Sequence, residues 1–124
     1  KENAENEGLA PLVEQLTKLN KEWGDITMKI GMNAMKNRDE VGGASVDYLM
    51  YSGYVCLAFF WAKMAAVAQQ KIAEGTTEEA FYKTKLQTAK FYYERILPRT
   101  LAHAQMISAG SESMMAVEED NFSF

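Results

Sequence analysis

A chain of 124 residues is long enough for one domain with its own hydrophobic core. Hydrophobic residues make up 48% of it and prolines number only two, which excludes a disordered segment and a proline-rich linker. Its net charge of −4, with both signs interspersed, lacks the basic patch of a nucleic-acid binder. We therefore expect a single domain over residues 1–124 that does not bind nucleic acid.

The N-terminal residues 1–8 are charged and polar, and we expect them to be frayed. They contain no apolar stretch of the kind found in a signal peptide. The chain does not begin with Met, which indicates a processed protein or a piece of a longer one. The single cysteine, Cys56, cannot form an internal disulfide and is expected to pack as a small hydrophobe. These features favour a cytoplasmic location.

The first predicted helix carries apolar residues at alternating spacings of three and four. This heptad pattern is typical of a helix packed lengthwise on a partner helix, and it predicts a helix over about residues 10–36. Pro11 is tolerated in a first turn, whereas Gly24 and Gly31 are interior and indicate either close helix approach or a local bend. The members of the pattern are Leu9, Leu12, Leu16, Leu19, Trp23, Ile26 and Ile30.

Residues 37–45 include two adjacent glycines and show no apolar periodicity. A phosphate-binding loop would need a preceding strand and the spacing of a glycine-rich motif, and neither is present. We expect a connection between helices, with Ser45 as the N-cap of the next one.

The second predicted helix, about residues 45–74, is the most apolar part of the chain. One stripe comprises Val46, Leu49, Met50, Gly53, Leu57, Phe60, Met64, Val67 and Ala68, and the other side carries Tyr51, Val55, Phe59, Trp61 and Ala62. A helix that is apolar nearly all round is usually central and packed by neighbours on several sides. A membrane span is the rival interpretation, but the uncharged run 49–62 is shorter than the roughly 20 residues that a bilayer requires. Gly75 is expected to end the helix.

The third predicted helix covers about residues 77–109. Thr76 and Glu79 have the spacing of a capping box, and Gly110 is expected to end the helix. Pro98 lies inside the pattern and leaves the carbonyl of Glu94 without its usual partner, so it either kinks the helix or splits it. After Gly110 we expect one short turn and a poorly ordered tail.

The predicted fold is all-α: an antiparallel up-down-up bundle of three long helices (about 10–36, 45–74 and 77–109) with a short C-terminal tail. Three helices do not hide all of its aromatic residues. Tyr92 and Tyr93, for example, are adjacent and would point about 100° apart on a regular helix. We therefore expect the bundle to be completed by a second copy or to dock on a domain outside this chain.

The sequence offers no obvious catalytic, cofactor-binding or metal-binding set. One histidine and one cysteine cannot form the usual zinc cluster, and the Glu-x-x-His motif of carboxylate-bridged metal sites is absent from the sequence. No serine or cysteine lies at a spacing from His103 that would indicate a catalytic triad. We therefore expect His103 to lie on the helix surface or at an interface.

One group of residues stands out as a candidate contact site. Arg95, Arg99 and His103 are spaced by four residues near Pro98, and Tyr92 lies beside them. Arginine grips phosphate or carboxylate in a bidentate manner, so these residues fit an anion or a partner domain. The simpler interpretation is a cationic stripe near a helix C-terminus, where positive charge is favoured.

Residues 46–65 and 81–115 together resemble the C-terminal extension of a bacterial branch of acyl-CoA dehydrogenases, the branch that includes the 3-methylmercaptopropionyl-CoA dehydrogenase type. The resemblance covers about two thirds of the chain and extends to helix one only in its general helical character. It rests most on Lys85, Ala89, Phe91, Tyr92, Leu97, Pro98, His103 and Gly110.

This resemblance implies a helical domain that follows a catalytic core. In the family that core binds FAD and the acyl-CoA thioester and holds the glutamate base for α,β-dehydrogenation. None of those motifs maps onto this chain, so no catalytic or cofactor-binding position is transferred to it. The resemblance implies an accessory domain with a structural, docking or oligomerisation role, whose partners are the core and a second copy. Two alternatives are a free-standing dimerisation or adaptor module, and a CoA or nucleotide binder that uses Arg95 and Arg99.

Overall fold

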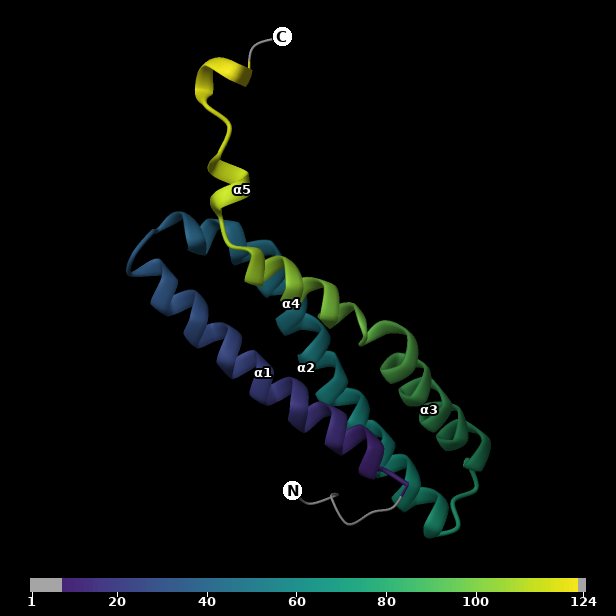
Figure 1. Cartoon of the computed structure of the whole chain (residues 1–124). Helices are drawn as coiled ribbons and strands as arrows, with labels where there is room; N and C mark the ends of the chain where they lie inside the picture. The colour runs from purple at the N-terminus through teal and green to yellow at the C-terminus, as the bar shows by residue number, and fades with distance from the viewer. Residues whose placement is uncertain (1–7, 123–124) are drawn as a thin grey trace.

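The computed structural model describes residues 8–122, and the segments 1–7 and 123–124 lie outside the described residues. Every regular element in the described part is helical, which confirms the predicted all-α bundle. Helices α1 (Ala10–Ala34) and α2 (Asp39–Ala73) lie side by side and run in opposite directions. The chain then returns along α2 through α3 (Glu79–Phe91), a π-helical turn η1 (Tyr92–Ile96) and α4 (Arg99–Ala109) (Figure 1).

The predicted heptad face of α1 forms one side of the core. Leu9, Leu19 and Ile26 are buried, and the other members of the pattern are partly buried against them. The helix ends at Ala34, two residues before the predicted end. A Cβ at Gly24 or Gly31 would meet no atom within 4 Å, so close helix approach is not the reason for either glycine.

The predicted connection at residues 37–45 is wrong, because α2 begins at Asp39 and both glycines are helical. Ser45 is therefore not an N-cap, and its hydroxyl donates to the carbonyl of Gly42 one turn back. The helix starts where the side chain of Asn37 accepts a hydrogen bond from the N–H of Asp39. The close approach of Ser111 accounts for a glycine at position 43, because a Cβ there would lie only 3.3 Å from the Cβ of Ser111.

The prediction that α2 is packed by neighbours nearly all round is wrong for one of its faces. Most of the apolar stripe that begins at Val46 faces solvent, with exposed fractions of 70% for Val46, 50% for Leu57 and 57% for Phe60. The buried face instead carries Ala44, Tyr51, Val55, Ala58, Ala65 and Ala68. Cys56 is also exposed rather than packed. Helices α1, α3 and α4 all contact the same side of α2, so its opposite side has no neighbour among the described residues.

In the part of the chain that the structure describes, α2 is the one helix long and apolar enough to cross a membrane. The core helix of a soluble protein meets the same criterion, so length and composition alone do not decide between them. Here one whole side of α2 is already occupied by other helices of the bundle.

Glycines end two of the helices, as predicted. Gly75 and Gly110 have φ angles of +80° and +75°, a region that side chains with a Cβ rarely adopt. The predicted capping box is wrong, because the hydroxyl of Thr76 accepts the N–H of Glu78 and α3 begins only at Glu79. The C-terminal segment contains two short helical turns, α5 (Glu112–Met115) and η2 (Glu119–Phe122), where one was predicted.

Candidate functional site

Pro98 neither simply kinks nor simply breaks the third helix. In the turn before it, the N–H of Leu97 donates to the carbonyl of Tyr92 at 2.9 Å, five residues back. The proline has no N–H for an ordinary helical bond to Glu94, and a π turn is one way to accommodate the missing donor. The helix then resumes at Arg99 as α4.

The π turn places two adjacent tyrosines on the core side of the bundle. Because a π turn is wider than an α turn, Tyr92 and Tyr93 both face α2, with exposed fractions of 6% and 4%. The expectation that the three helices leave some aromatic residues exposed therefore fails for this pair, but it holds for Phe59 and Phe60, which are 47% and 57% exposed. Their hydroxyls donate to the carbonyls of Tyr54 and Ala58 in α2, at 2.8 and 2.9 Å.

Burial controls the ionisation of these phenols. It raises the pKa of Tyr92 to about 12 and also raises the pKa of Tyr93 above its ordinary value. Tyr51, on the part of the buried face of α2 that meets α1, donates to the carbonyl of Leu19, and burial raises its pKa as well. All three phenols are therefore neutral donors at neutral pH that join helices, and none is placed as an acid or base for a reaction.

His103 holds α4 against α2. Its Nδ1 lies 2.8 Å from a carboxylate oxygen of Asp47, and its ring stacks on Tyr54 with centroids 5.7 Å apart. Asp47 and Tyr54 are two turns apart on the same side of α2, so both reach the same imidazole. A carboxylate–histidine pair could orient a general base, but no described serine or cysteine is hydrogen-bonded to this ring. The prediction of an interfacial histidine fits this arrangement.

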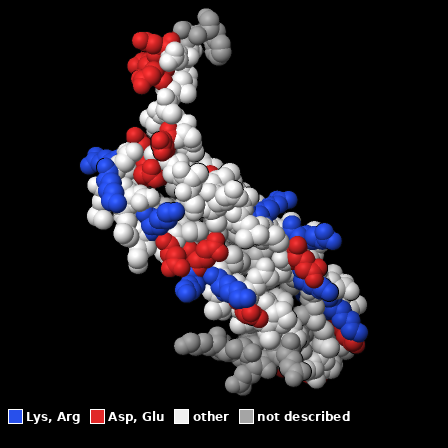
Figure 2. Space-filling model, in the orientation of Figure 1, with Lys and Arg blue, Asp and Glu red and all other residues white. Residues whose placement is uncertain are grey.

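The structure separates the four residues of the predicted contact site. Tyr92 and His103 face α2, whereas Arg95 in η1 and Arg99 at the start of α4 are exposed. Neither arginine forms an ion pair with any described residue. In Figure 2 basic and acidic side chains are interspersed along the visible face of the bundle, and acidic ones gather at the C-terminal end. The described residues also contain no cluster of potential metal ligands.

Sequence reasoning missed a polar clasp between the start of α2 and the segment that follows α4. The Glu40 carboxylate in the first turn of α2 accepts the backbone N–H of Ser111 at 3.0 Å and its hydroxyl at 2.6 Å. These bonds hold the corner that Gly110 makes and lower the pKa of Glu40. Glu40 and Ser111 are 71 residues apart, so no local pattern predicts the contact.

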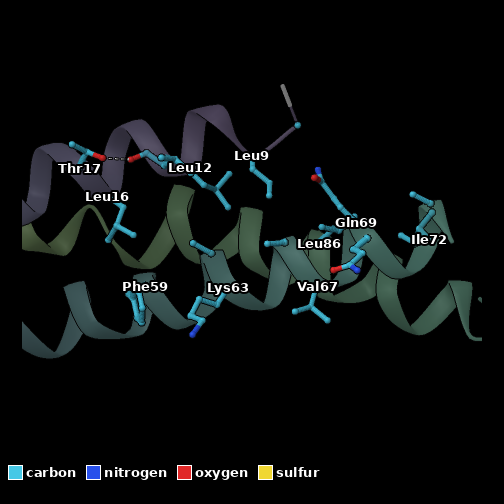
Figure 3. Close-up of a pocket in the computed structure, with 16 residues that line it drawn as sticks. Leu9, Leu12, Leu16, Thr17, Phe59, Lys63, Val67, Gln69, Ile72 and Leu86 are labelled. Carbon is cyan, nitrogen blue, oxygen red and sulfur yellow. Dashed lines mark hydrogen bonds between the residues drawn. The ribbon is translucent and has the colours of Figure 1, made fainter. Parts of the chain in front are cut away.

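A groove between α1 and α2 has a volume of about 1090 Å³ (Figure 3). Its lining includes Leu12 and Leu16 of α1 and Phe59 and Val67 of α2. Among the described residues that line it, the one cation is Lys63, whose ammonium lies 5.5 Å from the ring centre of Phe59. A dinucleotide such as FAD needs donors around its pyrophosphate, at a helix N-terminus or glycine-rich turn. The lining of this groove does not fit that requirement.

The comparison with known proteins identifies the family. A family model described as "Acetyl-CoA dehydrogenase C-terminal like" matches residues 1–118, which is nearly the whole chain. No curated protein matches the chain. The helical fold and the match agree with the resemblance noted in the sequence, although the match does not distinguish the 3-methylmercaptopropionyl-CoA dehydrogenase branch from others. This chain belongs to the family of C-terminal domains of acyl-CoA dehydrogenase-like proteins.

Proposed function

We propose that this chain is a single helical domain, over residues 1–124, of a longer FAD-dependent acyl-CoA dehydrogenase. In that enzyme the catalytic core would bind FAD and carry out the α,β-dehydrogenation of an acyl-CoA thioester. The domain would have no chemistry of its own and would serve in docking or assembly. The family match over residues 1–118 carries this proposal. We also propose that the parent enzyme belongs to the 3-methylmercaptopropionyl-CoA dehydrogenase-like branch and works in the cytoplasm.

The contacts within the bundle support a structural role. The buried phenols of Tyr51, Tyr92 and Tyr93 all donate to backbone carbonyls of neighbouring helices. The imidazole of His103 is likewise engaged by Asp47 and Tyr54. The groups best suited to proton transfer are thus used to join α2 to the helices beside it, as expected of a scaffold.

Arg95 and Arg99 are the side chains that we assign to contact with the catalytic core. Both are exposed and form no ion pair with a described residue, so they remain available for carboxylates of another domain. The same two residues would serve a CoA binder, but neither is among the residues that line the groove between α1 and α2. An affinity for CoA that disappears on changing both arginines to alanine would favour that alternative.

The experiment is to purify the 124-residue chain and the catalytic core of the same enzyme separately. We expect the isolated chain to show no flavin absorbance and no oxidation of acyl-CoA with an artificial electron acceptor. Added to the core, it should bind and raise the melting temperature of the core. A yellow chain that oxidises acyl-CoA by itself would contradict the accessory role, and a folded chain without affinity for the core would favour a free-standing adaptor.

A further inference from the structure

The solvent-facing side of α2 carries a heptad pattern of its own. We call this the outer seam, and its members are Val46, Met50, Gly53, Leu57, Phe60, Met64 and Val67. Their spacing alternates between four and three residues over three heptads, and all of them are exposed. A sustained repeat of this kind is what a helix needs in order to pack lengthwise against another helix. In this bundle no described element occupies that position.

The dimensions of the outer seam match a helix–helix interface. From Val46 to Val67 it is about 32 Å long at the rise of an α-helix. Half-exposed side chains of this size each present roughly 100 Å², so with Leu49 beside them they offer on the order of 700 Å². A standard interface buries about 800 Å² on each partner. A contiguous apolar surface of this size marks an interaction site more often than a solvated face.

The outer seam is complementary to itself when two copies run in opposite directions. Placing a two-fold axis between Cys56 and Leu57 brings Phe60 of each copy opposite Gly53 of the other. Gly53 leaves a notch there, because a Cβ at this position would meet nothing within 4 Å. The same axis brings Val46 opposite Val67 and Met64 opposite Leu49, so that these side chains can interdigitate.

The helix dipoles favour the same orientation. Asp39 lies at the N-terminal end of the outer face, and Lys71, paired with Glu74 at 3.0 Å, lies at the C-terminal end. With the axis above, Asp39 of one copy lies opposite Glu74 of the other, whose charge Lys71 already balances. A parallel pair would bring the two Asp39 carboxylates together and align the two helix dipoles, both of which are unfavourable.

We propose that the outer seam binds the outer seam of a second copy of this chain, antiparallel, and joins two bundles back to back through α2. This inference rests on the assembly role proposed above and names its surface and partner. A lipid surface is a weaker candidate occupant, since lipid imposes no heptad register. A helix lying on a membrane also usually carries several flanking Lys or Arg residues, whereas this chain has a net charge of −4.

The first test is the solution mass of the 124-residue chain over a concentration series, by light scattering or analytical ultracentrifugation. We expect a dimer whose dissociation constant rises roughly 30-fold or more in Phe60→Glu. The matched control is Met28→Glu on α1, since Met28 is 69% exposed and lies outside the outer seam. Circular dichroism should show the same helix content in both variants, and the control should dimerise like the parent.

The second test fixes the orientation by cysteine crosslinking in a Cys56→Ser background. We expect Val46→Cys mixed with Val67→Cys to form a disulfide-linked dimer under mild oxidation. Each variant alone should remain uncrosslinked, because its own cysteines would lie at opposite ends of the interface. Crosslinking of Val46→Cys alone would indicate parallel helices and would overturn the proposal.

The remaining outcomes are also decisive. A chain that stays monomeric at every concentration, or a Phe60→Glu variant that dimerises normally, overturns the proposal. If such a monomer binds the catalytic core, the accessory role stands and only the partner of the outer seam is wrong. If the chain instead binds vesicles of mixed neutral and anionic phospholipid through Phe60, the occupant is lipid and the proposal fails.

Discussion

The two faces of α2 show that the larger apolar side chains need not point inward. The inner face is built mainly from Ala44, Ala58, Ala65 and Ala68, whereas the outer face carries Leu, Met, Phe and Val. Small inner residues let α1, α3 and α4 approach α2 closely. Tyrosines from both sides, such as Tyr51 and Tyr93, then reach backbone carbonyls across the gap. Burial therefore follows shape and hydrogen bonding as well as hydrophobicity.

The difference between the faces also assigns them different roles. The inner face holds the fold of one chain together, and its polar groups are satisfied within that chain. The outer face contributes little to that fold and is free to bind another helix. Substitutions on the inner face should therefore change the free energy of unfolding, whereas those on the outer face should change association.

The sharpest comparison uses two aromatic residues of α2. Tyr51→Ala removes a side chain that is 0% exposed and should lower the free energy of unfolding by about 3–5 kcal/mol. Phe60→Ala, on the outer face, should change it by no more than about 0.5 kcal/mol. Urea unfolding at concentrations where the chain is monomeric measures both values. Equal losses would mean that the two faces contribute alike to the fold.

Enlarging a small residue should also have opposite effects on stability at the two faces of α2. Ala58 is 0% exposed, and Ala58→Leu should destabilise the chain by about 1–3 kcal/mol through overpacking. Gly53→Ala on the outer face should stabilise it by about 0.5–1 kcal/mol, because the new methyl group has free space in a helix. The same change should weaken the dimer by filling the notch for Phe60. Thermal melting and sedimentation of both variants check the two effects.

The buried phenols predict a loss of stability in alkali. Their pKa values are raised in the folded chain, so their contribution is complete below the ordinary pKa of about 10 and is lost as pH rises through the folded value. Tyr93→Phe should lower stability by about 0.5–1.5 kcal/mol at neutral pH and weaken this alkaline dependence. Tyr82→Phe is the matched control on α3, and denaturant unfolding from about pH 8 to about pH 11 is the measurement.

The smallest effect is expected at the clasp between Glu40 and Ser111. Hydrogen bonds from Ser111 lower the pKa of Glu40, so its contribution is complete above the ordinary carboxyl pKa and is lost as pH falls through the folded value. Glu40→Gln should melt slightly lower at neutral pH, with a smaller decline between about pH 5 and about pH 3. Glu112→Gln serves as the control, and an unchanged acid profile in Glu40→Gln would show that the clasp is not formed in solution.

Several features of the fold followed from local chemistry in the sequence. The heptad pattern of α1 predicted its buried face, and Gly75 and Gly110 predicted the helix ends because positive φ angles favour glycine. The start of α2 was predicted too late in the chain, because the adjacent glycines Gly42 and Gly43 are typical of a loop. Only the approach of Ser111, far away in the chain, explains why a glycine is needed at position 43.

The candidate site was predicted only in part. His103 was expected at an interface, but its partner Asp47 is 56 residues away and carries no local signal. Pro98 indicated an irregular turn, yet whether the chain would kink, split or form a π turn depended on how Tyr92 and Tyr93 pack on α2. Tyr92 and His103 face α2 while Arg95 and Arg99 are exposed, a division that the spacing of these residues in the sequence did not predict.

The sequence by itself determined that this protein is a helical bundle, where two of its helices stop, and which family it belongs to. These properties depend on periodicity, backbone preference and motif residues, all of which act over a few turns of chain. Only the tertiary structure decided which face of α2 is buried. Both faces are apolar enough for a core, and the choice rests on which one allows the neighbouring helices to approach closely with every buried hydroxyl hydrogen-bonded.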